Sequence, residues 1–280
     1  MDTTVIDAIV GRVIERLAER RIASAPSCRV LMLFSGASTG YVAGLKAIRM
    51  LSGAGHPLHV VLSASALHVI GEDNLRKAGA TKLSNPDTWL DAPRTIRESD
   101  VVLVPTLSMN TAAHLALGLM DSLLTTLILG ARLADKPVVA VADGADPYGN
   151  GGRIFSPDHT GAPALRAALA EHLATLKSFG IQLVGDGGFL WASAQAVGSA
   201  AQAKADLVVS DANSTSSIAQ PLPVATLHLS GLVTASDLSG LTRGAAVRLA
   251  AGARLTPLAQ EVLERQRARV TSDDKREVWS

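Results

Sequence analysis

The chain has 280 residues, of which 48% are hydrophobic and 18% are charged, and its formal net charge is +1. This length and apolar content can fill the core of one large or two ordinary domains, while the lack of a basic excess argues against nucleic acid and membrane surfaces as partners. A single cysteine, Cys28, excludes an intrachain disulfide, and no apolar run reaches the roughly 18–20 residues of a membrane helix, so we expect a soluble cytoplasmic protein.

The first predicted element is an amphipathic helix within residues 2–21, followed by a linker of serine, alanine and proline at residues 23–28. Its apolar residues recur at helical spacing and its charges lie mostly on the other side. The members of the apolar set are Val5, Ile6, Ile9, Val10, Val13, Ile14 and Leu17. Two interpretations stay open: a helix packed on its own domain or on an oligomer neighbour, and a docking helix of residues 1–22.

Three predicted strands end in small polar loops that open helices. The strand at 29–34 runs into residues 35–40, the strand at 58–62 into residues 63–66, and the strand at 101–104 into Pro105 and residues 106–111. Continuous apolar runs of this kind are typical of parallel strands that are covered on both faces. The carboxyl ends of parallel strands share one edge, and helix starts favour anions, so the pattern predicts a phosphate site there.

The remaining segments complete an α/β pattern. Residues 81–97 are expected to form a loop with little regular structure, and a strand at 138–141 leads to Asp143 and Asp146 at the same edge, where aspartates often only form turns. A glycine-rich loop over residues 148–161 precedes a helix at 162–179 and a strand at 181–184. The predicted fold is therefore a three-layer Rossmann-like, flavodoxin-like parallel sheet over residues 29–185.

From residue 186 the composition changes to glycine, alanine and serine. Short strands are predicted at 207–210, 224–229 and 246–250, a helix begins at Thr256 and Pro257, and a charged tail ends the chain. We expect residues 186–280 to form a small C-terminal α/β module.

Familiar catalytic signatures are missing from the sequence. No set of His, Asp and Glu has zinc spacing, so no metal is predicted, and neither a nucleophile elbow nor a dinucleotide or P-loop glycine pattern is present. His114 lies one helical turn after Asn110 and could reach the site, although a structural or surface role is favoured.

With these loops in view, residues 29–145 resemble the homo-oligomeric flavin-containing cysteine decarboxylases and flavin prenyltransferases. The segments Phe34–Gly40 and Val61–Ala66 look like the first two flavin loops of that family. The segment Pro105–Thr111 resembles its Pro-Ala-Ser-Ala-Asn-Thr loop, and Gly118–Thr125 the Gly-Ile-Ala-Asp-Asn-Leu-Leu-Thr continuation.

The resemblance implies an FMN-binding fold that forms trimers or dodecamers with the flavin between subunits. Asn110 matches the catalytic asparagine of the decarboxylases. The candidate cofactor-binding residues are Gly36, Ala37, Ser38, Thr39, Ser63, Ser65, Ser108, Met109, Asn110, Thr111 and Asp143.

The sequence departs from both family activities. The catalytic histidine of the decarboxylases falls on Ala92 here, and no histidine occurs from residue 69 to 113. The arginine that the prenyltransferases carry after the strand at 138–141 is replaced by Ala142 or Asp143. The sequence therefore favours flavin binding over either reaction.

The two ends of the chain carry a second resemblance. The first helix and its linker look like the encapsulation peptides of enzymes packed in bacterial microcompartments, and Leu255–Ala259 looks like a segment of proteins associated with them. We expect an FMN-binding flavoprotein that handles electrons or maintains a cofactor in a microcompartment, with a shell or cargo protein bound through residues 4–21. A lyase or transferase, and a non-catalytic assembly protein, are the alternatives.

Overall fold

The computed structural model describes residues 3–158, 161–215, 227–229, 231–238, 241, 245–266 and 268–272. These residues belong to two compact units, Met1–Asp211 and Ala212–Ser280. None of the described helices combines the length and the apolar character that crossing a membrane requires.

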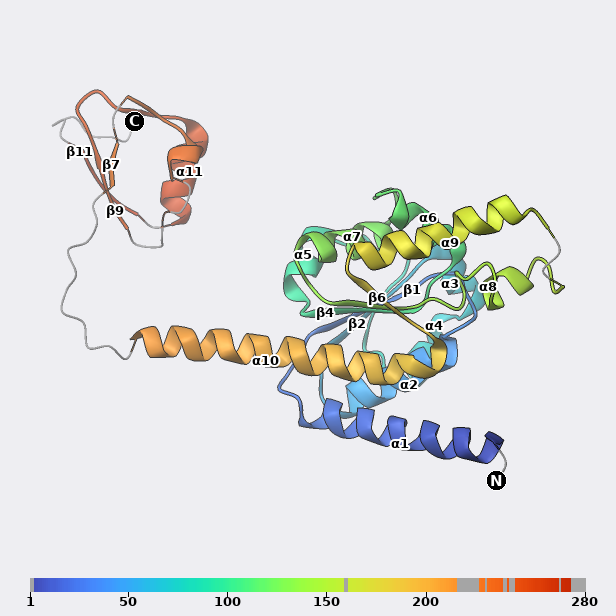
Figure 1. Cartoon of the computed structure of the whole chain (residues 1–280). Coiled ribbons are helices and arrows are strands. Elements are labelled where there is room, and N and C mark those ends of the chain that lie inside the picture. Colours follow the sequence, from blue (N-terminus) through green and yellow to red (C-terminus); the bar gives the residue numbers. More distant parts are fainter. Residues whose placement is uncertain are drawn as a thin grey trace. The chain divides into compact units, whose positions relative to one another are not determined.

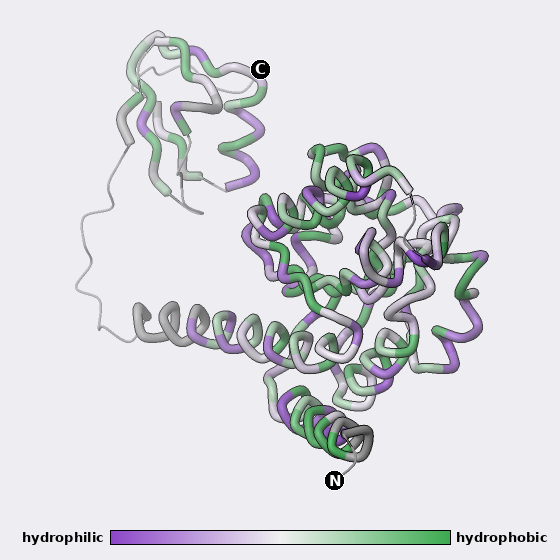
Figure 2. The backbone as a smooth tube through the Cα atoms, turned by 45° about the vertical axis from the view of Figure 1, so that its right-hand side comes forward, coloured by the Kyte–Doolittle hydropathy of each residue, from purple (hydrophilic) through white to green (hydrophobic). Residues whose placement is uncertain are grey.

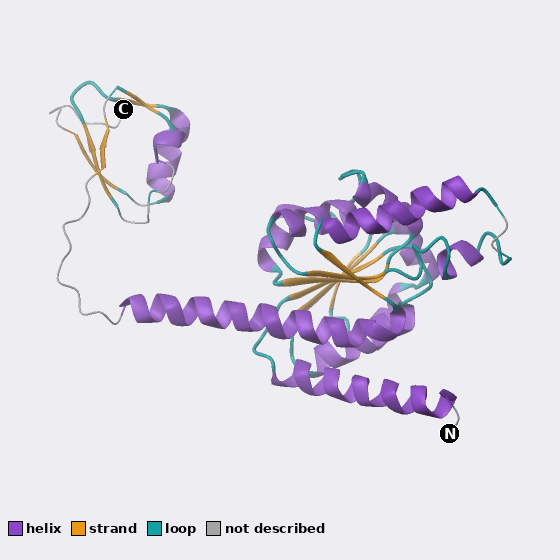
Figure 3. Cartoon of the chain, viewed as in Figure 1, coloured by secondary structure: helices purple, strands orange, loops and turns teal. Residues whose placement is uncertain are grey.

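A six-stranded parallel sheet with the strand order β3-β2-β1-β4-β5-β6 forms the centre of the first unit (Figures 1 and 3). The strands are β1 (Val30–Phe34), β2 (Leu58–Leu62), β3 (Lys82–Ser84), β4 (Val101–Thr106), β5 (Val138–Val141) and β6 (Ile181–Val184). Every residue of β1, β2, β4 and β5 is buried, as continuous apolar strands between two helical layers require. The predicted Rossmann-like class is confirmed.

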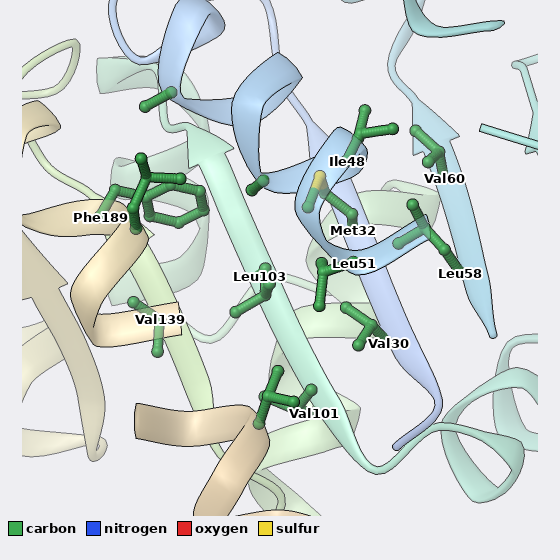
Figure 4. Packing of buried hydrophobic residues seen from close by; sticks show 14 of the residues in the cluster. Val30, Met32, Ile48, Leu51, Leu58, Val60, Val101, Leu103, Val139 and Phe189 are labelled. Carbon is green, nitrogen blue, oxygen red and sulfur yellow. The ribbon is translucent and has the colours of Figure 1, made fainter. Parts of the chain in front are cut away.

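Helices cover both faces of this sheet. One layer contains α1 (Thr3–Ser24), α2 (Tyr41–Gly53), α3 (Ala64–Val69), α4 (Glu72–Lys77) and α10 (Phe189–Thr215). The other contains α5 (Ala92–Glu98), α6 (Met109–Ala116), α7 (Leu123–Leu133) and α9 (Pro163–Ser178), while the short α8 (Asn150–Arg153) lies in the loop after β5. Figure 4 shows the first layer, in which Ile48 and Leu51 of α2 and Phe189 of α10 meet the side chains of four strands.

An ion pair joins three elements at the amino edge of the sheet. Arg29 donates to Asp100 at 2.6 Å, and Lys204 of α10 reaches the same carboxylate at 3.2 Å. Burial alone would raise the pKa of Asp100, but the hydrogen bonds from Arg29 and Lys204 outweigh it and lower the pKa to about 2. Nearby, burial raises the pKa of the Cys28 thiol to about 12, which keeps it protonated at neutral pH.

The N-terminal helix differs in part from its prediction. It runs to Ser24, so the first two residues of the predicted linker at 23–28 are helical, and the helix ends just before Pro26, whose ring disfavours helix in the residue preceding it. Its last turns are packed rather than tethered, since Ala18 and Ile22 are 0% and 1% exposed.

Two further predictions were wrong, and the boundary between the units also differs. Residues 81–97, expected to form a loop, contain β3 and α5, because Asp91 caps α5 and Pro93 fits its first turn. Residues 207–210, expected to form a strand, continue α10. The second unit therefore begins at Ala212 instead of residue 186, since residues of α10 from Phe189 to Ala201 belong to the first core.

The second unit is a small α/β module, as predicted. Its sheets are β11-β9-β7 and β10-β8, with parallel pairing throughout. The elements are β7 (Leu227–Leu229), β8 (Leu232–Val233), a 3-10 turn at Ala235–Leu238, β9 (Ala246–Leu249), β10 (Arg254–Leu255), α11 (Pro257–Arg265) and β11 (Arg269–Ser272). Thr256 caps α11 through its side chain. The predicted strand at 224–229 is described only from Leu227, and the charged tail from residue 273 lies outside the described residues.

Candidate flavin site

The candidate site lies at the carboxyl edge of the sheet, where the strand order reverses between β1 and β4. Open α/β sheets bind ligands at such a switch point because the loops that follow the two strands diverge there. Here the loop 35–40 follows β1 and the loop 107–108 follows β4, and the two strands are paired directly. The pairing shifts by one residue between Met32 and Phe34, which accommodates Pro105 within β4.

Ser35 and Thr106 lock the two central loops together. The Ser35 hydroxyl donates to the Thr106 carbonyl at 2.7 Å, and the Thr106 hydroxyl donates to the Ser35 carbonyl at 3.0 Å. The Ser35 hydroxyl also accepts the N–H of Ser108 at 2.9 Å. Both Ser35 and Thr106 are buried, so these bonds fix the entrance of each loop in place.

Two hydroxyls that the sequence predicts for the site also cap helices. Ser63 accepts the N–H of Ala66 at 3.1 Å at the start of α3, and Ser108 accepts the N–H of Thr111 at 3.2 Å at the start of α6. An N-cap serine fixes where the helix begins, and therefore where its remaining free N–H groups point. The arrangement presents two helix starts, each with partial positive charge, at one edge of the sheet.

The loop after β1 offers further donors. The backbone N–H groups of Ala37, Ser38 and Thr39 form no hydrogen bond with any residue that the structure describes. Ala37 is buried, whereas Ser38 is exposed and Thr39 is half-buried. Consecutive unpaired N–H groups beside helix starts suit the oxygens of a phosphate ester.

Glycines bring these loops close together. A Cβ on Gly36 would lie 2.5 Å from the Cβ of Ser65, and one on Gly144 would lie 2.8 Å from both the Leu107 carbonyl oxygen and the Ala37 Cβ. Gly40 has a φ of 88° and approaches the Pro105 carbonyl so closely that a Cβ there would clash. The loops after β1, β2, β4 and β5 therefore form one packed cradle, and its donors fit a phosphorylated flavin.

The loop after β4 carries the candidate catalytic residue on its outer side. Met109, Asn110 and Thr111 form the first turn of α6; Asn110 is exposed, and the other two are half-buried. The Thr111 hydroxyl lies 2.9 Å from that of Ser108. Asn110 is thus free to meet a ligand, whereas Thr111 also holds the turn together.

Asp143 is placed differently from the other predicted residues. Its carboxylate accepts the N–H of Asp186 at 2.6 Å, which ties the loop after β5 to the end of β6. Desolvation, and next the negative charge of Asp143, raise the pKa of Asp186. Asp143 therefore has a turn-stabilising role at the margin of the cradle.

His114 forms a pair with Asp121, at the surface of the same region. Its Nδ1 lies 3.0 Å from the Asp121 carboxylate, and the hydrogen bond from His114 lowers the pKa of Asp121. Asp121 directly precedes Ser122, which starts α7 with a capping box. Among the described residues no group of three His, Cys, Asp or Glu side chains could hold a metal ion.

The sequence predicts the loops 35–40 and 106–111 for the site without singling out Ser35 or Thr106 within them, and it does not predict Gly144. The position of Ser35 immediately after an apolar strand was a usable signal, because the first residue beyond a buried strand lies at the sheet edge. Gly144 gave no such signal, since its contact with the other loops depends on how β5 pairs with β4.

Comparison with solved structures returns, among others, an FMN-dependent cysteine decarboxylase. The chain is 26% identical to the FMN-dependent cysteine decarboxylase TvaF from thioviridamide biosynthesis, with 61% of this chain and 98% of that one covered and a TM-score of 0.46. A PPC decarboxylase mutant is 20% identical over 60% and 96% of the two chains, with a TM-score of 0.43. MrsD from a Bacillus species is 12% identical over 58% and 86%, with a TM-score of 0.41. No curated protein matches the chain.

Comparison with protein families is decisive. The model of the Flavoprotein family matches residues 20–210, which include the whole parallel sheet and all four loops of the cradle. The match confirms the predicted family and, with it, the predicted flavin cofactor. The chain belongs to the Flavoprotein family.

Proposed function

We propose that the cradle binds FMN by its phosphate and that the flavin serves a redox or cofactor-maintenance reaction. The observation that carries this proposal is the convergence, at one edge of the sheet, of two serine-capped helix starts and of three N–H groups that no described residue accepts. The family match supports FMN as the flavin. Bound FMN supplies the electron transfer, while the chain provides position and electrostatics.

The residues divide the binding between them. Ser38, Thr39 and Ser65 offer hydroxyls and N–H groups to the phosphate, Ser63 offers its hydroxyl because its N–H is donated to the Phe34 carbonyl, and Gly36 and Ala37 let the backbone come close. Ser108, Met109, Asn110 and Thr111 lie on the β4 side, where the ring is expected. The family resemblance implies that a trimer or dodecamer completes the site, and the exposed Leu117, Leu119 and Met120, which directly follow α6, support a covering subunit.

The test is to purify the chain, record its visible spectrum, release the chromophore and identify it. The stripped protein is then titrated with FMN and with riboflavin, which lacks the phosphate. We expect FMN to bind at least about tenfold more tightly, or about 1.4 kcal/mol. Equal affinity for riboflavin, or no flavin binding at all, would overturn the proposal. Light scattering of the FMN-loaded protein measures its oligomeric state.

The microcompartment role rests on the surface of α1. Five large aliphatic side chains of this helix are 41–52% exposed, although Ala18 and Ile22 on another side are buried against the core. The exposed set is Ile6, Ile9, Val10, Val13 and Leu17. Figure 2 shows hydrophobic colour along this helix. A contiguous exposed apolar stripe marks an interaction surface, and we propose that a shell or cargo protein of a bacterial microcompartment binds it.

The docking test uses surface substitutions because removal of residues 1–22 would also remove the buried Ala18 and Ile22. The double variant Val13→Ser, Leu17→Ser should lose co-purification with co-expressed shell protein, and Glu19→Ser on the exposed polar side should keep it. FMN binding should be equal in the wild type, the double variant and Glu19→Ser. Unchanged recruitment of the double variant would refute docking, and recruitment without any flavin would favour a non-catalytic assembly protein.

A flavin-dependent lyase or transferase is the second candidate, and the exposed Asn110 at the cradle favours it. Anaerobic assays with cysteine-ended peptides, phosphopantothenoylcysteine and prenyl phosphates test it. Turnover that is lost in Asn110→Ala would establish this function in place of a redox role, and no turnover with any of the three substrate classes would reject it.

A further inference from the structure

The face of α6 that carries Asn110 also carries His114. The two residues are four positions apart, so their side chains lie one above the other on the helix. Ala112 and Leu115, on the other side of α6, are 2% and 1% exposed and hold the helix against its own domain. Asn110 and His114 therefore share the side of α6 that its own core leaves uncovered.

Asp121 fixes the imidazole of His114. Its carboxylate lies 3.0 Å from Nδ1, and it is held at the entrance of α7 by the capping box that begins with Ser122. When Nδ1 donates to this carboxylate, the neutral ring carries its lone pair on Nε2. Nε2 forms no hydrogen bond with any described residue, and the His114 side chain is 33% exposed. The ring is thus oriented on one side and open on the other.

This is the arrangement of a general acid–base pair, in which a carboxylate sets the tautomer and stabilises the imidazolium that forms. We propose that His114 is the proton-transfer residue of the flavin site and that Asp121 positions it. The proposal rests on the proposed function, since it requires a flavin in the cradle. His114 would then be the base of the site, since Ala92 stands where the decarboxylases carry their catalytic histidine.

The step concerns a proton only. An N–H, O–H or S–H bond of the bound substrate breaks, a new N–H bond forms at Nε2, and the positive charge is balanced by the Asp121 carboxylate. In the reverse direction the imidazolium returns the proton. A bound flavin would supply the electron transfer, and the residues of the chain would handle only the proton. Among the described residues Asp121 is the charged group paired with His114. Of the helices that pack on α6, α7 carries Arg132, and α9 carries Arg166, Glu171, His172 and Lys177.

The first test measures contact without turnover. The full chain is treated with diethyl pyrocarbonate, with and without saturating FMN, and modification of each histidine is followed by mass spectrometry. A ligand bound in such a site buries most of its surface against the side chains that line it. Bound FMN should therefore shield the His114 ring and slow its modification about fivefold or more. His68, exposed in the last turn of α3, is the internal control and should react at the same rate. Equal reactivity of His114 in both states would overturn the proposal.

The second test measures proton coupling. The midpoint potential of bound FMN is determined from about pH 5.5 to 8.5 in the wild type and in each variant. The pH dependence of the potential should differ between the wild type and His114→Gln, should differ less for Asp121→Asn, and should be the same in His68→Gln. A pH dependence in His114→Gln identical to that of the wild type would refute the assignment. Because FMN affinity is measured for each variant beforehand, a chain that binds no flavin refutes the proposed function instead.

Discussion

Substitution of Gly144 by alanine tests how closely the loops of the cradle approach one another. The new Cβ would lie 2.8 Å from the Leu107 carbonyl oxygen and from the Ala37 Cβ, so backbone of the loops after β1 or β4 must move. Overpacking of this kind costs about 1–3 kcal/mol of unfolding free energy. Movement of the loops should also misplace the N–H donors, and we expect FMN affinity to fall at least about tenfold, or about 1.4 kcal/mol.

Gly53→Ala is the matched control, since a Cβ at this exposed helical position meets no atom within 4 Å. It should leave FMN affinity unchanged and raise stability by up to about 1 kcal/mol through helix propensity. Urea unfolding gives the free energies, and fluorescence quenching of FMN gives the affinities. If Gly144→Ala matches Gly53→Ala in both measurements, the close approach of the loops is not needed for the cradle.

Three further outcomes follow from described contacts. His56→Leu should lower the unfolding free energy by about 2 kcal/mol or more, because the buried ring binds the Cys28 N–H at 3.2 Å and the Ile22 carbonyl at 2.9 Å; hydrogen exchange should show α1 opening first. The ion pair lowers the pKa of Asp100 to about 2, so Asp100 contributes at most about 2 kcal/mol to the unfolding free energy above its unfolded pKa. This contribution is lost as the pH falls from about 4 to 2. Asp100→Asn should remove this acid-dependent loss from unfolding curves. Ser63→Ala should cost about 1 kcal/mol of stability as an N-cap and should reduce the preference for FMN over riboflavin in parallel titrations, whereas an unchanged preference would place the phosphate elsewhere.

Local sequence was enough to predict most elements of the sheet. Val101–Val104 and Leu58–Leu62 are short, largely apolar runs that end at turn-forming residues, which is typical of buried strands, and the serines that follow them are caps whose chemistry acts within three residues. The Flavoprotein family could be predicted because its loops keep their residue types and order along the chain. These features depend on neighbours in sequence, and so the sequence alone determines them.

Long-range packing decided the rest. Residues 207–210 have strand-like composition, yet they extend a helix whose earlier turns are buried in the first core, so burial overrode β-propensity. The exposed stripe of α1, the contact of Gly144 with Leu107 and Ala37, and the lack of a described partner for Nε2 of His114 each depend on which surfaces other elements leave uncovered. The sequence by itself determined the strands, the caps and the family, and only the tertiary structure decided which loops touch and which side chains stay open to a ligand.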